Sequence, residues 1–123
     1  MIEKTVIDYL NSFTPDETPD IPCYAERPEE EPGGKYLVVE KTGSTEENHI
    51  TDATIAISSY ADTMYEASEL NEAVKYVMRR ITMLPNVSAV RLNSDYNFTS
   101  TAAKCYRYQA VFILTYYEEE QDV

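Results

Sequence analysis

Hydrophobic and polar residues alternate most regularly near the C-terminal end of the chain, over residues 104–117. One set of alternate positions holds Tyr106, Tyr108, Ala110, Phe112, Leu114 and Tyr116. The other set includes Val111 and Ile113, so the segment is apolar on both faces near its middle. A period of two predicts a β-strand, and two apolar faces indicate a central one. We therefore expect a helix layer on one side of the sheet and a partner or second sheet on the other.

A β-hairpin is predicted in the first half of the chain. Residues 36–41 and 50–60 are rich in β-forming side chains and enclose a polar turn at residues 42–48, which contains Gly43. The second of these strands alternates, so it should have one buried side and one wet or partner-facing side. The wet or partner-facing side carries Asp52, Thr54, Ala56 and Ser58.

Two further strands are expected nearer the edges of the sheet. Pro22 and Pro28 flank residues 23–26 and confine that strand to an edge, because proline cannot donate a ladder hydrogen bond. Residues 87–92 form the other strand, which a polar loop at residues 93–103 follows.

Apolar residues at steps of three and four predict two helices. The first covers residues 2–13, and the second begins at Thr63, an N-cap with Glu66 three residues on, and runs to about residue 84. The core stripe of the second helix holds Ala67, Leu70, Val74, Val77, Met78, Ile81 and Leu84. Its opposite side carries Tyr65, Tyr76 and Met83, which need a partner. The pattern predicts a single-domain α+β fold, with two helices packed on a mainly antiparallel sheet.

The charge balance limits the possible partners. The chain of 123 residues has 22 acidic and 10 basic residues and a net charge of −12. Residues 1–62 hold 14 acids and 4 bases, whereas residues 63–123 hold 8 and 6. Such a surface repels phosphates, so we expect no specific nucleic-acid binding. We divide the chain into one domain, residues 1–117, and an acidic tail, residues 118–123.

The sequence contains no motif that indicates catalysis, cofactor binding or metal binding. Cys23 and Cys105 lack C-x-x-C spacing, so we expect two reduced, partly buried thiols. The only histidine, His49, stands near Glu46, Glu47 and Asp52, a set that we interpret as a solvated turn. Phosphate-loop and hydrolase motifs do not occur, and three glycines leave little for a phosphate cradle. We expect a protein that is not an enzyme and has no cofactor.

No apolar run approaches the roughly 20 residues that span a bilayer, and the N-terminus carries acids where a signal peptide is apolar. We therefore expect neither a membrane span nor secretion by this route.

Basic and aromatic residues suggest an oligomer interface. Lys75, Arg79, Arg80 and Arg91 form the main positive cluster, which either makes ion pairs within its helix or meets the acidic half of a neighbouring subunit. The chain has 11 tyrosines, a residue type enriched at interfaces, and several stand at element ends, Tyr60 and Tyr117 among them. The candidate interface residues are Tyr65, Tyr76, Arg79, Arg80, Arg91, Tyr96 and Phe98.

Three segments of the chain resemble a known family. Residues 55–78, 91–101 and 106–117 are similar, in pattern and order, to the small tail-terminator or tail-completion proteins of long-tailed bacteriophages and prophages. None of the three segments is a catalytic signature, and a neighbouring head-to-tail joining family shares part of the pattern.

The resemblance implies a structural role. It implies an α/β subunit that forms a hexameric ring on the last ring of the tail tube, stops tube growth and presents a surface to the head connector. The implied partners are copies of itself, the tail tube protein and the head-tail connector protein. The implied location is the virion tail, assembled in the host bacterial cytoplasm.

Two other classes of function stay open. An acidic inhibitor that mimics DNA is compatible with the net charge of −12, although the carboxylates cluster in turns and in the tail. A small regulatory module that binds a metabolite between helix and sheet is compatible with the predicted fold.

Overall fold

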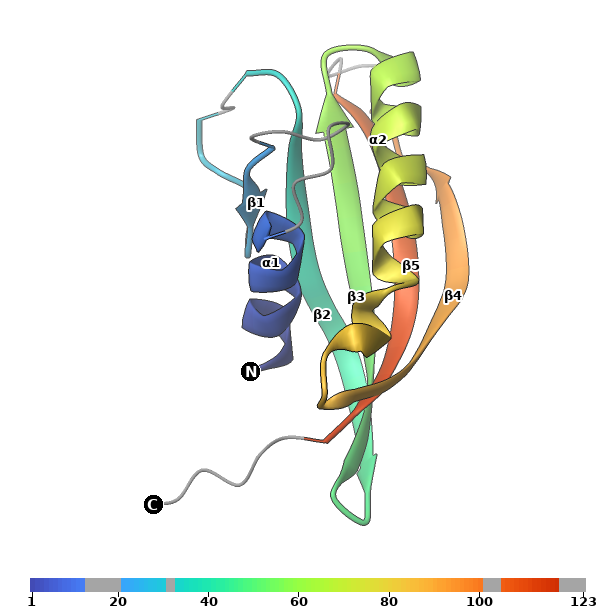
Figure 1. Ribbon diagram of the computed structural model, residues 1–123. Helices are drawn as coiled ribbons and strands as arrows, with labels where there is room; N and C mark the ends of the chain where they lie inside the picture. The colour runs from blue at the N-terminus through green and yellow to red at the C-terminus, as the bar shows by residue number, and fades with distance from the viewer. Residues whose placement is uncertain (13–20, 31–32, 101–104, 118–123) are drawn as a thin grey trace.

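The computed structural model describes residues 1–12, 21–30, 33–100 and 105–117. Within them a five-stranded sheet has the strand order β1-β2-β3-β5-β4 (Figure 1). The strands are β1 (Cys23–Tyr24), β2 (Tyr36–Glu47), β3 (Ile50–Ala61), β4 (Val87–Asn97) and β5 (Tyr106–Tyr116). The helices are α1 (Ile2–Ser12) and α2 (Met64–Met78), and a short 3₁₀ helix, η1, spans Ile81–Met83. The predicted α+β fold is confirmed.

Strand β5 lies inside the sheet, as its two apolar faces predict. It pairs antiparallel with β3 from Tyr106 to Tyr116 and with β4 on its other side. Strands β2 and β3 are also antiparallel, and only the short β1 runs parallel to its neighbour, β2. The C-terminal tail at residues 118–123 lies outside the described residues.

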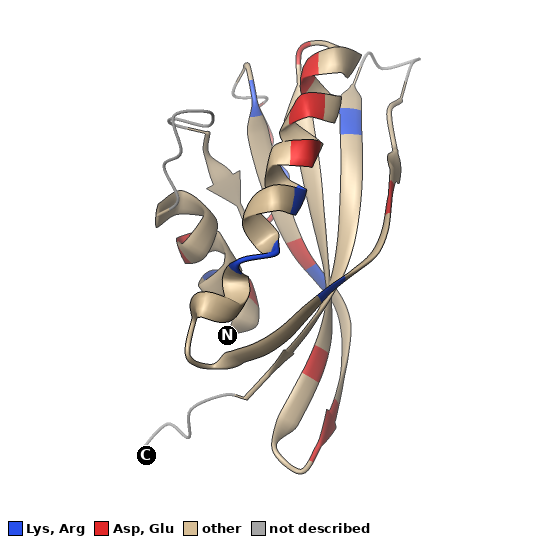
Figure 2. Cartoon of the chain, turned by 45° about the vertical axis from the view of Figure 1, so that its right-hand side comes forward, with Lys and Arg blue, Asp and Glu red and all other residues tan. Residues whose placement is uncertain are grey.

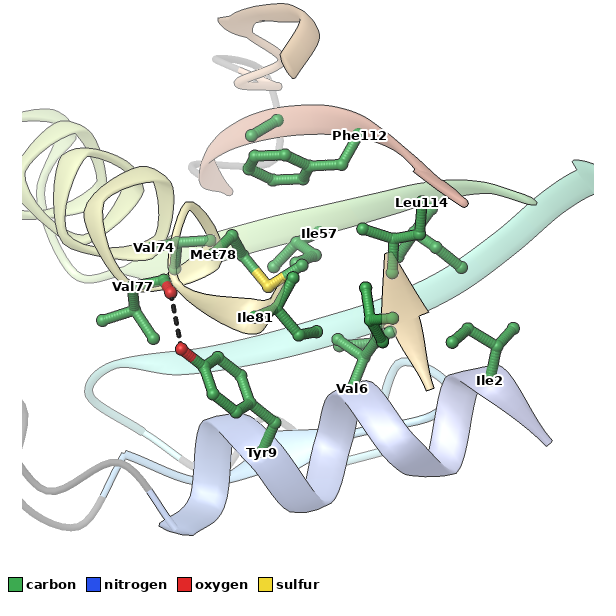
Figure 3. Close-up of a cluster of buried hydrophobic side chains, with 14 of the residues drawn as sticks. Ile2, Val6, Tyr9, Ile57, Val74, Val77, Met78, Ile81, Phe112 and Leu114 are labelled. Carbon is green, nitrogen blue, oxygen red and sulfur yellow. Dashed lines mark hydrogen bonds between the residues drawn. The ribbon is translucent and has the colours of Figure 1, made fainter. Parts of the chain in front are cut away.

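Both helices cover the same face of the sheet, which we call the helix face (Figure 1). Between the helices and this face lies the hydrophobic core, which buries Phe112 and Leu114 of β5 and Val74 and Met78 of α2 (Figure 3). The Tyr9 hydroxyl of α1 donates a hydrogen bond of 2.8 Å to the carbonyl oxygen of Val77, and burial raises the pKa of this tyrosine. This bond fixes α1 to the end of α2.

Helix α2 begins as predicted but ends earlier. The Thr63 hydroxyl accepts a hydrogen bond of 3.1 Å from the backbone N–H of Glu66, which confirms the N-cap. The prediction of a helix to about residue 84 is wrong, because the α-helix ends at Met78 and η1 follows. The chain must turn back here to start β4 at Val87, and the tighter 3₁₀ turn still buries Ile81 completely.

The β2–β3 hairpin is longer than predicted. Pairing continues to Glu47 and Ile50, so the turn contains only Asn48 and His49, both with positive φ, and the predicted turn at residues 42–48 is wrong. A β-bulge at Thr42 lets the strand continue through a polar segment. Residues 41–50 are all exposed and project beyond the helices (Figure 1). We call residues 41–50 the arm.

Strand β4 also extends past its predicted end. The expected polar loop at residues 93–103 is wrong for residues 93–97, which are strand, and residues 101–103 lie outside the described part of the chain. Polar residues suit this strand because it is an edge and most of its side chains are exposed. Bulges interrupt its pairing with β5 at Ser88 and Asn93.

The face opposite the helices, which we call the open face, has a small core of its own. Tyr36 and Tyr60 stack with ring centroids 4.5 Å apart, beside Val38. The predicted wet side of β3 is therefore wrong at this end, where Ala56 and Ser58 are buried. Tyr60, which we expected at an element end, is also buried, because Tyr36 of β2 stacks on it.

Substitutions on α2 test which side of the helix faces the sheet. Val77 is buried and Tyr76 is 59% exposed, as predicted. We expect Val77→Ala to lower the free energy of unfolding by about 2 kcal/mol, because it removes buried methyl groups and leaves a cavity. Tyr76→Ala should change it by less than about 0.5 kcal/mol. Urea denaturation measures both, and a larger loss for Tyr76→Ala than for Val77→Ala would contradict the assignment.

Candidate functional site

The basic residues of the predicted cluster do not lie together. The Lys75 ammonium is 2.7 Å from an Asp95 carboxylate oxygen and 2.8 Å from one of Glu72. The hydrogen bond that the ammonium donates to Asp95, and then the one that it donates to Glu72, raises the pKa of Lys75. Lys75 is thus neutralised by its own chain, and its pairing with Glu72 is the intrahelical contact that we considered.

Arg91 is separated from Arg79 and Arg80 by the sheet. It pairs with Ile113 of β5, whose side chain belongs to the open face, whereas Arg79 and Arg80 follow α2 on the helix face. Paired residues on neighbouring strands point to the same side of a sheet. The sequence could not reveal this separation, because the register of β4 against β5 depends on two bulges.

Arg79 and Arg80 form an exposed basic patch where α2 ends (Figure 2). Neither guanidinium makes a salt bridge with a described carboxylate. The Arg80 guanidinium lies 5.7 Å from the ring centroid of Tyr76, and Met83 of η1 is 68% exposed. We call Tyr76, Arg79, Arg80 and Met83 the α2-end patch.

Tyr65, Tyr96 and Phe98 lie at the opposite end of the molecule. The Asn97 side chain contacts the sulfur of Met64 at 3.5 Å, which brings the start of α2 and Tyr65 to the end of β4. The rings of Tyr96 and Phe98 are 5.6 Å apart, and the Tyr96 hydroxyl accepts a hydrogen bond of 2.7 Å from Gln109. The candidate residues therefore lie at both ends of the molecule. At this end Tyr65 belongs to α2 on the helix face, whereas Tyr96 and Phe98 form a second surface on the open face, where Tyr96 pairs with Gln109.

Sequence reasoning missed the arginine that holds the second surface together. The Arg107 guanidinium lies 4.1 Å from the ring centroid of Phe98 and donates a hydrogen bond of 2.9 Å to the Tyr60 hydroxyl. Arg27 approaches the same Tyr60 ring at 5.5 Å. Aromatic and arginine residues alternate along this contact chain, and only the strand register could have shown that they meet.

Among the described residues, the sheet has an open edge on each side. Within that part of the chain β4 pairs only with β5 on one side, and on the other β1 covers β2 only at Leu37 and Val38. The outer edge of β2 is therefore open from about Glu40 to Glu47, a stretch whose residues are all exposed. An open edge presents unpaired backbone N–H and C=O groups, which another strand can satisfy.

The described residues offer little space for a small ligand. A cavity of about 30 Å³ lies between the helices and β2, lined by Leu10, Leu37, Leu70 and Val74 among others. A second cavity, of about 90 Å³, adjoins Tyr36, Tyr60 and Cys105 on the open face. Sites for drug-sized ligands typically measure about 300–1,000 Å³. Both cavities are therefore too small for such a ligand.

The titratable groups do not assemble a reactive site in the described part of the chain. No three His, Cys, Asp or Glu side chains there converge on a possible metal position. Cys23 and Cys105 are free thiols, and burial raises the pKa of Cys23 to about 12. His49 stands in the turn at the tip of the arm. None of the described helices is long and apolar enough to cross a membrane.

Comparison with models of known protein families gives no match to this chain, and comparison with curated protein sequences gives none either.

Substitutions of the two acidic partners of Lys75 test how much each partner stabilises the fold. Asp95→Ala should cost about 1–3 kcal/mol, because it also leaves the Asn71 amide, which is 1% exposed, without its 3.2 Å partner. Glu72→Ala, which removes only the exposed partner of Lys75, should cost less than about 0.5 kcal/mol. Chemical denaturation measures both variants. Equal costs would show that Asn71 does not depend on Asp95.

Proposed function

We propose that the protein is a tail-terminator subunit of a long-tailed bacteriophage or prophage. Copies join head to tail into a closed ring, which is hexameric in the family that residues 55–78, 91–101 and 106–117 resemble. The ring caps the tail tube, ends its polymerisation and gives the head connector a docking surface. The observation that carries this proposal is the pair of open strand edges on opposite sides of one sheet.

Two different open edges favour a ring over a symmetric dimer. Contact between the β2 edge of one copy and the β4 edge of the next is heterologous, and such contacts close into a ring when the rotation between copies divides a full turn. The two strands run in opposite directions within the sheet, so copies arranged around an axis along the strands would pair them antiparallel. Every copy then covers both of its open edges.

The surface suits a conduit for DNA. With 22 acidic and 10 basic residues, most of the surface repels phosphate, so a lumen built from this chain would let DNA pass without binding it. A ring also has two faces, and exposed aromatic residues occur at both ends of the molecule. Tyr65, Tyr96 and Phe98 mark one end and Tyr76 the other. These ends are our candidates for the connector and tube contacts.

A head-tail joining protein is the second candidate. It would use the same open edges to form a ring and would differ only in its partners, since it binds between head and tail and does not end a growing tube. Whether tube growth stops therefore separates the two roles.

Tube growth tests the proposal directly. We expect the purified protein, alone or with tube protein, to form particles of one fixed multiple of the 14.1 kDa chain mass, measured by light scattering. Added to growing tubes, it should block further elongation, which electron microscopy of tube lengths measures. Rings that leave tube growth unchanged would favour the joining role, and a monomer without effect on tubes would contradict both roles.

A further inference from the structure

The arm is an exposed projection that begins at Lys41, which pairs with Glu3 of α1 at 4.0 Å, and ends in an acidic tip. It lies beyond the helix layer at one end of the sheet (Figure 1), and Glu46 and Glu47 near its tip make no salt bridge with a described basic residue. Ile50, just after the turn, is 51% exposed. Strand β5 pairs with β3 only as far as Thr51, so the tip of the arm from Glu47 to Ile50 extends past the rest of the sheet.

The α2-end patch has the complementary character. Arg79 and Arg80 supply two positive charges without a described acidic partner, and Tyr76 and Met83 supply exposed apolar area beside them. The tip of the arm carries two negative charges, Glu46 and Glu47. Figure 2 shows acidic residues in red on the arm and basic residues in blue where α2 ends.

Strand register shows that Glu46 of the arm and the α2-end patch lie on the same side of the sheet. Glu46 pairs with Thr51, Thr51 with Tyr116, and Tyr116 with Val87 of β4. Side chains in one such row share a face, and Tyr116 and Val87 belong to the core beneath the helices. Glu46 therefore projects from the helix face, the face on which the α2-end patch lies.

The same row gives the height of the contact along the strands. In a closed ring all copies lie at the same level along the ring axis, so this row of paired residues continues from one copy into the next. Glu46 at the β2 edge of one copy would then lie near Val87 at the β4 edge of its neighbour. Val87 directly follows the turn after η1, and η1 packs against β4. The neighbour's α2-end patch, to which Met83 of η1 belongs, is therefore a basic surface close to the arm.

We propose that the arm of each copy docks on the α2-end patch of the next copy in the ring. Glu46, on the helix face, pairs with Arg79 and Arg80 of the neighbour, and Glu47, which points to the other face of the sheet, adds negative charge beside this contact. This inference rests on the proposed ring and names the contact that orients its subunits. Charged pairs at such a contact select the correct orientation and speed the encounter more than they add affinity.

Two charge-reversed variants test the contact. One carries Glu46→Lys and Glu47→Lys, and the other carries Arg79→Glu and Arg80→Glu. Each alone places like charges together in every interface, so we expect the concentration needed for ring formation to rise at least about tenfold. The defect should diminish at high salt, which screens exposed charges. Sedimentation across a salt series, with and without tube protein, measures assembly.

An equimolar mixture of the two variants is the decisive sample. In a ring where they alternate, the reversed arm meets the reversed patch and the original arm meets the original patch, so rings with an even number of copies should form again. As a control, Glu29→Lys with Glu30→Lys makes the same charge change on an exposed loop outside the arm and should assemble normally. Circular dichroism confirms that each variant is folded.

The outcomes separate this inference from the proposed function. Rescue in the mixture supports the arm contact. Normal assembly of both variants alone, or folded variants that stay unassembled in the mixture, would overturn it while the ring proposal stands. If the unmodified protein forms no ring, alone or with tube protein, both proposals are wrong.

Discussion

The structure depends on the pairing of β5 with β3 and β4. Strand β5 pairs on both sides along most of its length, and its Phe112 and Leu114 form the floor on which α2 packs. Because β5 occupies this inner position, β4 is forced to one edge and β2 to near the other. The hydrophobic effect that buries β5 thereby decides which backbone groups stay open for assembly.

The alternation of residues 106–116 and the stripe of α2 were predictable because burial imposes a period on the sequence. The arm and the second half of β4 were not, since a strand exposed on both sides has no hydrophobic period and reads as a loop. The polar run around Gly43 and Ser44 shows this, as does that around Asn93. Bulges at Thr42, Ser88 and Asn93 then set the register, on which the sequence carries no visible signal.

Only part of the candidate surfaces could be predicted, because only some of their residues follow a hydrophobic period. Tyr65 and Tyr76 are exposed because the helical period places them away from the core. Residues that meet across strands, such as Arg107 and Phe98, depend on register, and Arg91 is assigned to the wrong cluster when only sequence proximity is used. The open edges could not be predicted from the sequence either, because the sequence does not show that β5 inserts between β3 and β4.

Open edges and charge act together in the assembly that we propose. Backbone pairing between edges supplies contacts without much specificity, and a free edge invites wrong partners as readily as right ones. Charges on the arm and at the end of α2 would restrict the contact to one neighbour in one orientation. Bulges and polar side chains on β4 keep the edge from pairing too readily before that neighbour arrives.

The central claim is that the β2 edge of one copy lies beside the β4 edge of the next. Thr45, Asp52, Thr115 and Ala89 form one row across the sheet, with Thr45 and Ala89 at its two edges. Cysteine at Thr45, combined in turn with cysteine at Ala89, Arg91 or Ser94 in a chain whose native cysteines are replaced by alanine, reports this contact through disulfide formation between copies.

Three positions on β4 are needed because tilted strands stagger the register in a closed sheet. We predict that one of the three pairs gives, on mild oxidation, a ladder of covalent oligomers that ends at the copy number of the ring. Assembled rings in which none of the three pairs cross-links would contradict the claim.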